Sequence, residues 1–251
     1  RSVVYSPDGR VLAVSGLFPG FVDIWDVPAR KLIRRLQQNQ FSRVAFSPHG
    51  DLLLTKTEDQ IRFWRTDTWD LIRQVPLTGK VMVLKFSPDG THLASLIFPD
   101  ELTVWEVNQS KLLRPIPGLR LPKARFGRFD FSPDSKFLVI GDANGRLQGI
   151  DLTSGDTIFD VVEAHPEQIE SVVWSPNSSV IASGGAQEGG AIRLWDATSG
   201  KSLGELQGHT SWITDLLFSE NKDGLRLYSS SGDQTIRIWD VDLGDAIVTL
   251  V

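Results

Sequence analysis

Short alternations of apolar and polar residues, separated by turn residues, recur along the 251-residue chain. Near the C-terminus, residues 211–218, 225–228 and 235–239 are rich in β-branched and aromatic side chains. Such side chains favour the pleated, half-buried surface of a strand. The pattern therefore predicts short strands joined by tight turns.

Two sequence anchors repeat along the chain with the same period. The first is an aromatic residue followed by Ser and Pro; five such copies and a weaker sixth lie 40 to 45 residues apart, at Tyr5, Phe46, Phe86, Phe131, Trp174 and Phe218. The second ends an apolar run, with steps of 39 to 45 residues, at Trp25, Trp64, Trp105, Ile150, Trp195 and Trp239. A period near 40 residues is typical of repeat architectures. The chain is therefore expected to hold six repeats.

The turn chemistry of the first anchor indicates a hairpin. In Ser87-Pro88-Asp89-Gly90, Pro presets φ at the second position and Gly suits the fourth, as in a type I β-turn. Each repeat then supplies one strand before this turn and three after it. We predict an all-β fold of six four-stranded antiparallel sheets, at about 1–40, 41–79, 80–122, 123–167, 168–210 and 211–251.

The six repeats resemble the WD-repeat family, whose fold is a β-propeller with one blade per repeat. In that family a His before the blade, a Ser or Thr on the second strand, an Asp in the next turn and a Trp on the third strand form a hydrogen-bonded chain. The matching residues are His209, Ser229, Asp233 and Trp239. A buried indole N–H without a partner costs roughly 1 to 3 kcal/mol, so a stabilising role is expected. The resemblance covers the whole chain and implies a single propeller domain, 1–251.

Several copies depart from the family pattern. The fifth has His165, Ser183 and Trp195, but residues 184–190 replace the usual short turn and contain no Asp, so its chain is expected to be incomplete. The first three copies lack the preceding Gly-His, and the fourth has Ile150 in place of Trp. These repeats are expected to rely more on apolar packing.

The two ends of the sequence suggest a longer parent protein. The first residues are typical of an inner strand and the last, 245–251, of an outer one, so no strand is left over to close a ring. Because seven blades are usual in WD-repeat proteins, we expect this chain to be a segment of such a protein with seven or more blades. A complete six-bladed ring is the alternative.

The composition limits which kinds of chemical site the chain can hold. The absence of Cys excludes disulfides and thiolate metal sites, and the four His residues lack ligand spacing. A formal charge of −5 gives no global nucleic-acid signature, and no apolar run reaches the length of a membrane span. No secretory signal is visible, so a cytoplasmic location is expected. The sequence opens at Arg1 rather than Met, so the natural N-terminus is expected to lie upstream. We predict no metal, cofactor or small-molecule substrate, and no catalytic residue.

Aromatic side chains mark a candidate partner surface. Loops between second and third strands, and the links between repeats, are expected on one face of a propeller. The aromatic residues assigned to that face are Phe18, Phe21, Phe98 and Trp212. Trp and Phe dominate interface hot spots, so these residues are predicted to bind a protein or peptide. The alternative is that they pack on neighbouring loops.

A basic stretch offers a second candidate surface. Between residues 106 and 130 no acidic residue interrupts the cations Lys111, Arg114, Arg120, Lys123, Arg125 and Arg128. They are candidates for binding an acidic partner, a polyphosphate or nucleic acid. The competing interpretation is a solvated connection containing three prolines.

Taken with the resemblance, these features favour a non-catalytic scaffold that mediates protein or peptide binding. The rival class is a six-bladed propeller enzyme of the hydrolase or lactonase type, which requires carboxylates or a metal at the channel mouth. The scattered carboxylates Asp8, Asp89, Asp134 and Asp240 stand at turn or repeat positions, so structural roles are expected for them.

Overall fold

The computed structural model describes residues 2–16, 20–37, 43–57, 60–76, 81–97, 101–107, 128–222 and 224–250. The chain divides into two compact units, Arg1–Ile97 and Phe98–Val251. Each is described by itself. The prediction of one domain over 1–251 stays a prediction.

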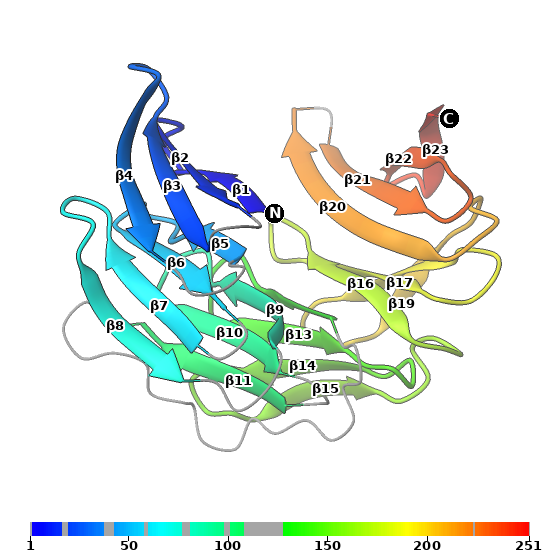
Figure 1. Ribbon diagram of the computed structural model, residues 1–251. Coiled ribbons are helices and arrows are strands. Elements are labelled where there is room, and N and C mark those ends of the chain that lie inside the picture. Colours follow the sequence, from blue (N-terminus) through cyan, green and yellow to red (C-terminus); the bar gives the residue numbers. More distant parts are fainter. Residues whose placement is uncertain are drawn as a thin grey trace. The chain divides into compact units, whose positions relative to one another are not determined.

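The described residues of the first unit form ten strands (Figure 1). They are β1 (Ser2–Tyr5), β2 (Val11–Ser15), β3 (Phe21–Asp26), β4 (Lys31–Gln37), β5 (Arg43–Phe46), β6 (Leu52–Lys56), β7 (Gln60–Arg65), β8 (Leu71–Pro76), β9 (Val81–Phe86) and β10 (His92–Ile97).

The second unit holds thirteen described strands. They are β11 (Glu101–Glu106), β12 (Arg128–Phe131), β13 (Phe137–Gly141), β14 (Leu147–Asp151), β15 (Thr157–Val161), β16 (Ile169–Trp174), β17 (Val180–Gly185), β18 (Ile192–Asp196), β19 (Ser202–Leu206), β20 (Ile213–Asn221), β21 (Gly224–Ser231), β22 (Ile236–Asp240) and β23 (Asp245–Leu250).

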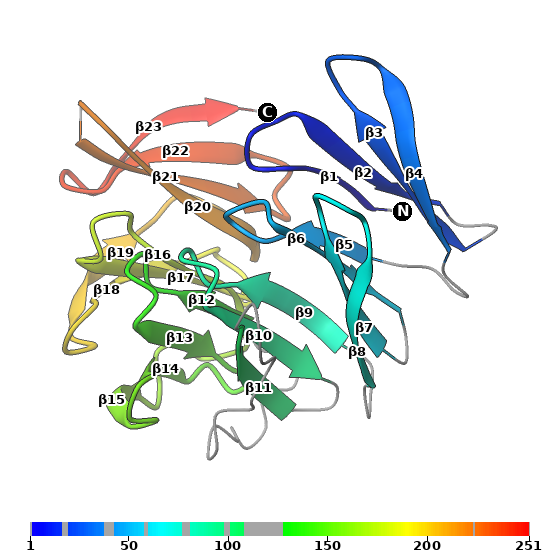
Figure 2. The ribbon, with the colours of Figure 1, turned by 90° about the vertical axis from the view of Figure 1, so that its left-hand side faces the viewer.

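Strands consecutive in the chain form six antiparallel sheets, and the described residues contain no helix (Figures 1 and 2). Five sheets have four strands, in the orders β1-β2-β3-β4, β5-β6-β7-β8, β12-β13-β14-β15, β16-β17-β18-β19 and β20-β21-β22-β23. The third repeat contributes β9, β10 and β11; the segment predicted as its fourth strand lies outside the described residues. The all-β prediction is confirmed, and we number the sheets one to six in chain order.

Apolar side chains on facing sheets form the core. In the second unit, Leu147 of sheet four and Ile169 and Ile181 of sheet five are fully buried in one cluster. In the first unit, Ile24 of sheet one packs in a cluster with Leu53 of sheet two. Alternating side chains point to opposite faces of a strand, so a central sheet can bury both faces against its neighbours.

The Ser of the repeated turn organises the first hairpin in sheets one to five. In sheet three the Ser87 hydroxyl donates to Asp89 Oδ1 at 2.7 Å and accepts the backbone N–H of His92 at 2.9 Å. The N–H of Gly90 donates to the Ser87 carbonyl at 2.9 Å and closes the β-turn. Gly90 has a φ of 69°, a region open to glycine at little steric cost. The equivalent Ser178 of sheet five holds a φ of 60° without that freedom.

Loops that join sheets meet loops that join second and third strands. The backbone N–H of Ile169, which begins sheet five, donates to the carbonyl of Asp142 in the β13–β14 loop at 3.0 Å. In sheet six the N–H of Gly232, in the β21–β22 turn, donates to the carbonyl of Trp212 at 2.9 Å. We call this end of each sheet the connecting end. The repeated Ser turns lie at the other end.

Candidate functional site

Sheet six contains a buried chain of polar side chains. The Trp239 indole N–H donates to Ser229 Oγ at 2.8 Å, and Ser229 Oγ lies 2.7 Å from His209 Nε2. His209 Nδ1 lies 2.8 Å from a carboxylate oxygen of Asp233. Because the carboxylate accepts the Nδ1 proton, Nε2 accepts the serine hydroxyl and every member has a partner. The structure thus places the four residues in the order that the family pattern implies.

Asp233 anchors this chain. Its carboxylate accepts hydrogen bonds from His209 Nδ1, from the backbone N–H of Thr210 at 3.1 Å, and from Thr235 through N–H at 2.9 Å and Oγ1 at 2.7 Å. Burial alone raises the pKa of the Asp233 carboxyl, but the hydrogen bonds from Thr235, His209 and Thr210 outweigh it and hold the pKa well below its usual range. The charged form is therefore the one that the fold stabilises.

Sheet five builds the same chain with a different last member. The Trp195 indole N–H donates to Ser183 Oγ at 2.8 Å, and His165 Nε2 lies 2.8 Å from the same oxygen. Gln187 Nε2 stands 3.4 Å from His165 Nδ1, at the place that Asp233 takes in sheet six. A Cβ on Gly185 would lie 1.9 Å from Gln187 Oε1, so glycine there admits the amide. The missing Asp was predicted; the substitute Gln187 was not.

The neutral replacement leaves His165 without a carboxylate partner. His165 is 1% exposed. Desolvation, followed by the charge of Arg193, lowers the pKa of His165 to about 4, against smaller opposing effects of Gln187 and Ser183. Burial without a carboxylate disfavours the imidazolium form.

Sheet two keeps part of this arrangement without a histidine. Trp64 Nε1–H donates to Thr55 Oγ1 at 3.0 Å, and Thr55 is fully buried. Thr55 was not singled out from the sequence, although its spacing to Trp64 is close to that of Ser229 to Trp239. In sheet one the register places Val14 at that position, and Trp25 is 37% exposed, so water can reach the indole.

Only two of the four predicted partner-binding aromatics lie among the described residues. Phe18 and Phe98 fall outside them. Phe21, in the first unit, is half-buried, and the guanidinium of Arg35 lies 4.1 Å from its ring centroid. Arg35 is itself held by two hydrogen bonds to Asp23, at 2.7 and 2.8 Å. Phe21 is therefore a packed side chain with one face covered by a cation.

Trp212, in the second unit, is both supported and exposed. It lies in the link before β20, at the connecting end, and 49% of its surface reaches solvent. A Cβ on Gly232 would come within 2.6 Å of the indole, so the ring lies directly against that glycine. Val162 and Ile236, exposed by 65% and 47%, lie at the same end of their sheets and were not singled out from the sequence.

The basic stretch is described at one residue. Arg128 begins β12, and its guanidinium donates to Glu170 at 3.2 Å. The other predicted anion-binding residues, Arg114, Arg120, Lys123 and Arg125, lie outside the described residues, as does Lys111. Arg128 is therefore already neutralised by a neighbouring strand.

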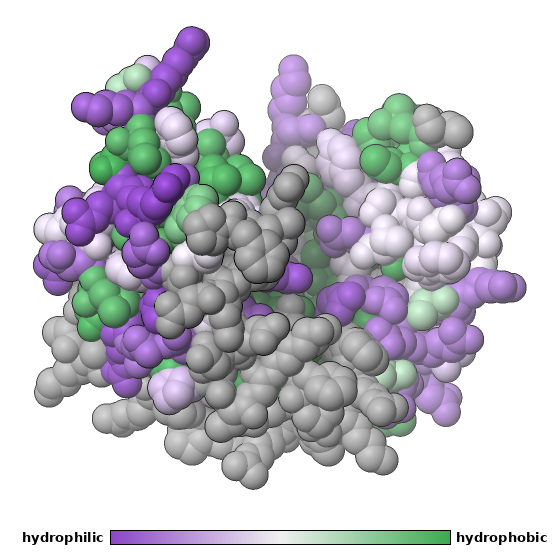
Figure 3. Space-filling model, in the orientation of Figure 1, coloured by the Kyte–Doolittle hydropathy of each residue, from purple (hydrophilic) through white to green (hydrophobic). Residues whose placement is uncertain are grey.

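A second apolar surface lies on the outer strands of sheet six. Figure 3 shows hydrophobic side chains gathered over β22 and β23. All six residues of β23 are exposed, among them Ile247 at 51% and Leu250 at 53%. The sequence predicted an outer strand here but not the exposure of its apolar side chains.

Two segments match a family model described as WD domain, G-beta repeat, at residues 157–196 and 200–240. The segments end at Trp195-Asp196 and Trp239-Asp240, so both hydrogen-bonded chains close within them. Residues 157–240 therefore contain two WD repeats, which supports the WD-repeat resemblance of the chain. A second model, described as Eukaryotic translation initiation factor eIF2A, matches residues 1–63.

Curated relatives match most of the chain. It is 27% identical over 209 residues to apoptotic protease-activating factor 1 of Danio rerio, covering 83% of this chain and 16% of that protein. It is 26% identical over 261 residues to cell division cycle 20.1, cofactor of APC complex, of Arabidopsis thaliana, covering 96% and 54%. The chain thus spans about half or less of these relatives' lengths.

A solved structure supports the fold. The crystal structure of the computationally designed Ika8 protein aligns with a TM-score of 0.78 and 20% identity, covering 99% of this chain and 73% of that one. At this identity the likeness concerns the fold alone.

The WD repeat of sheet six contains a Ser, His and Asp in the order of a catalytic triad. Ser229 and His209 are only 2% and 3% exposed, and Ser229 Oγ already accepts the Trp239 indole proton. A nucleophile must reach a substrate carbonyl, and this hydroxyl has no access to one. The arrangement can stabilise the hairpin stack but cannot attack a substrate.

Within the described ranges, no three His, Asp or Glu side chains gather closely enough to hold a metal ion. No helix in those ranges is long and apolar enough to cross a membrane.

Proposed function

We propose that this WD-repeat chain is a non-catalytic interaction module that binds a protein or peptide through the connecting ends of its sheets. Relatives carry names that imply such roles, among them a cofactor of the APC complex. The WD-repeat resemblance supports a protein or peptide as the partner. The choice of the connecting ends as the binding surface rests on the exposed residues of this chain.

Trp212 carries the proposal. Its ring is fixed against Gly232, yet about half of it remains in solvent. A preorganised aromatic side chain loses little conformational entropy on binding, which is why Trp anchors many interfaces. Val162 and Ile236 add exposed apolar surface at the same end of their sheets.

The rival enzyme would require converging carboxylates or a metal. In the described part of the chain, the Ser229 triad is buried and no metal-binding cluster is present. For the anion-binding rival through residues 111–128, the one described cation, Arg128, is already paired with Glu170. Neither rival gains a specific observation.

The test compares two exposed apolar residues at opposite ends of sheet six. Trp212→Ser removes the anchor, and Leu243→Ser is the matched control, because Leu243 is 75% exposed in the β22–β23 turn. Burying such a side chain is worth roughly 1.5 to 3 kcal/mol, so Trp212→Ser should weaken partner binding by about tenfold or more.

Binding is measured as the amount of each partner protein captured from native lysate per folded molecule, with thermal unfolding recorded in parallel. Leu243→Ser should leave capture unchanged. If Trp212→Ser lowers the melting temperature while capture per folded molecule stays the same, Trp212 is loop core and the proposal fails.

A further inference from the structure

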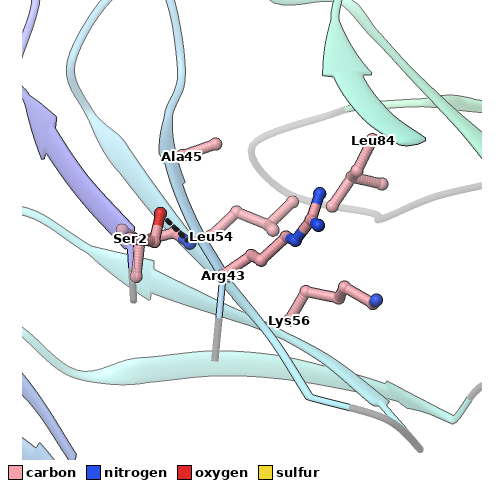
Figure 4. Close-up of a pocket in the computed structure, with 7 residues that line it drawn as sticks. Ser2, Arg43, Ala45, Leu54, Lys56 and Leu84 are labelled. Atoms are coloured by element: carbon pink, nitrogen blue, oxygen red, sulfur yellow. Dashed lines mark hydrogen bonds between the residues drawn. The ribbon is translucent and has the colours of Figure 1, made fainter. Parts of the chain in front are cut away.

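A pocket of about 260 Å³ opens in the first unit between the inner strands of sheets one, two and three. Its described lining comprises Ser2, Arg43, Val44, Ala45, Leu54, Lys56 and Leu84. Figure 4 shows Arg43 and Lys56 extending from neighbouring strands to the same side, with Leu84 across the opening. The lining is therefore an apolar floor with two cations at its rim.

Strand register places the two cations face to face. Arg43 of β5 pairs directly with Lys56 of β6, and residues directly opposite in an antiparallel pair project from the same face. Like charges in this position are destabilising. The cost to Arg43 falls when an anion lies beside it, because that cation then has an opposite charge nearby.

Arg43 is available for such an anion. Its side chain is exposed and forms no hydrogen bond or ion pair with any described residue. Arg35, by contrast, is held by Asp23. A guanidinium presents a planar fork of N–H donors that matches the two oxygens of a carboxylate or phosphate.

The charge distribution of the chain points the same way. Residues 1–97 carry 13 Lys and Arg against 9 Asp and Glu, a formal charge of +4, and the remaining 154 residues carry 13 against 22, a charge of −9. The pocket therefore lies in the basic unit of an acidic chain. A field of this sign concentrates anions near the opening.

The pocket also lies at the connecting end. Arg43 is the first residue of β5, after the link from sheet one, and Lys56 is the last residue of β6. Ser2 Oγ accepts the backbone N–H of Val44 at 3.4 Å and ties the inner edges of sheets one and two together (Figure 4). The rim is thus built on paired strands rather than on a loop.

We propose that this pocket binds an oxyanion, a carboxylate or phosphate group, held by Arg43 and Lys56 beside the apolar side chains of Ala45, Leu54 and Leu84. The oxyanion belongs to an acidic side chain of the partner peptide. This assignment rests on the proposed function. The site would make one acidic residue of the partner a determinant of specificity.

The first experiment uses inorganic phosphate as the probe. At constant ionic strength, replacing chloride with phosphate should raise the melting temperature of the chain, because a ligand bound only to the native state stabilises it. Arg43→Gln should weaken the apparent phosphate affinity by about tenfold or more, the expected effect of losing charge-assisted hydrogen bonds. Arg10→Gln is the matched control, because it removes one exposed charge from the turn at the other end of sheet one.

In phosphate-free buffer, Arg43→Gln should leave the melting temperature unchanged or raise it, since it removes the repulsion with Lys56. A lower melting temperature would mean that Arg43 stabilises the fold itself and would overturn the proposal. Equal phosphate stabilisation of the wild type, Arg43→Gln and Arg10→Gln would also overturn it, whatever Trp212→Ser does.

A fluorescent hexaglutamate peptide tests the source of the anion, with hexaglutamine as its uncharged counterpart. The wild type should bind hexaglutamate more tightly by fluorescence anisotropy, and Arg43→Gln alone should abolish the difference. Phosphate binding that depends on Arg43 without any preference for hexaglutamate would overturn the peptide assignment. If Trp212→Ser leaves partner capture unchanged while both Arg43 effects hold, the proposed function fails and the oxyanion site stands.

Discussion

Replacing Asp233 with Ala should cost sheet six much of its local stability. The carboxylate accepts four hydrogen bonds from His209, Thr210 and Thr235. The two threonines are near solvent and can bond water after the change, whereas the His209 side chain is fully buried and keeps only the longer contact of its Nδ1 with Thr235 Oγ1, at 3.2 Å. Hydrogen bonds to a charged group are worth about 1.5 to 3 kcal/mol, so we expect a loss near the upper end of that range.

Urea unfolding of Asp233→Ala, followed by tryptophan fluorescence, measures this loss directly. For a chain of this size each kcal/mol lowers the melting temperature by roughly 2 to 4 °C, so a thermal scan should show a fall of about 5 to 10 °C. Gln187→Ala is the matched control, because Gln187 meets His165 at only 3.4 Å and carries no charge. Equal losses in the two variants would refute the view that the carboxylate anchors the chain.

Three further predictions follow from the same geometry. The fold lowers the pKa of His165 to about 4, from an ordinary histidine value of 6.5, so its contribution to stability should be complete above pH 6.5 and decline by up to about 3 kcal/mol as the pH falls towards 4. Urea titrations across that range should show a smaller decline in Gln187→Asp, whose carboxylate supports the imidazolium. Thr55→Val should leave the Trp64 indole N–H unpaired and cost about 1 to 3 kcal/mol by urea unfolding, and an unchanged midpoint would contradict this. Ser178→Gly should relieve the positive φ and raise the unfolding free energy by up to about 1 kcal/mol, whereas a loss would show that the serine makes a needed contact.

The regular part of the fold was predictable because each repeat carries its own local signals. The Ser-Pro turn fixes a hairpin through bonds within a few residues, as between Ser87 and His92, and the apolar run ending at Trp239 pairs with the neighbouring strand. Such contacts depend on residue type and short spacing. They can therefore be predicted without knowledge of the tertiary structure.

The contacts that sequence reasoning missed depend on exact register or on a substitute of different chemistry. Gln187 reaches the place of an Asp because Gly185 leaves room for its amide, which the glycine-rich loop did not reveal. Arg43 and Lys56 stand 13 residues apart and become neighbours only through the pairing of β5 with β6. The Thr55 partner of Trp64 could have been found from its spacing, by analogy with Ser229 and Trp239.

Site-specific photo-crosslinking tests the central claim, that partners bind at the connecting ends. A photoreactive p-benzoylphenylalanine replaces Trp212 in one variant and Asn177, exposed in the β16–β17 turn at the other end of its sheet, in a second. Irradiation in native lysate, read by gel electrophoresis and mass spectrometry, should give covalent partner adducts from position 212 and none from position 177. Adducts from position 177 alone would contradict the account.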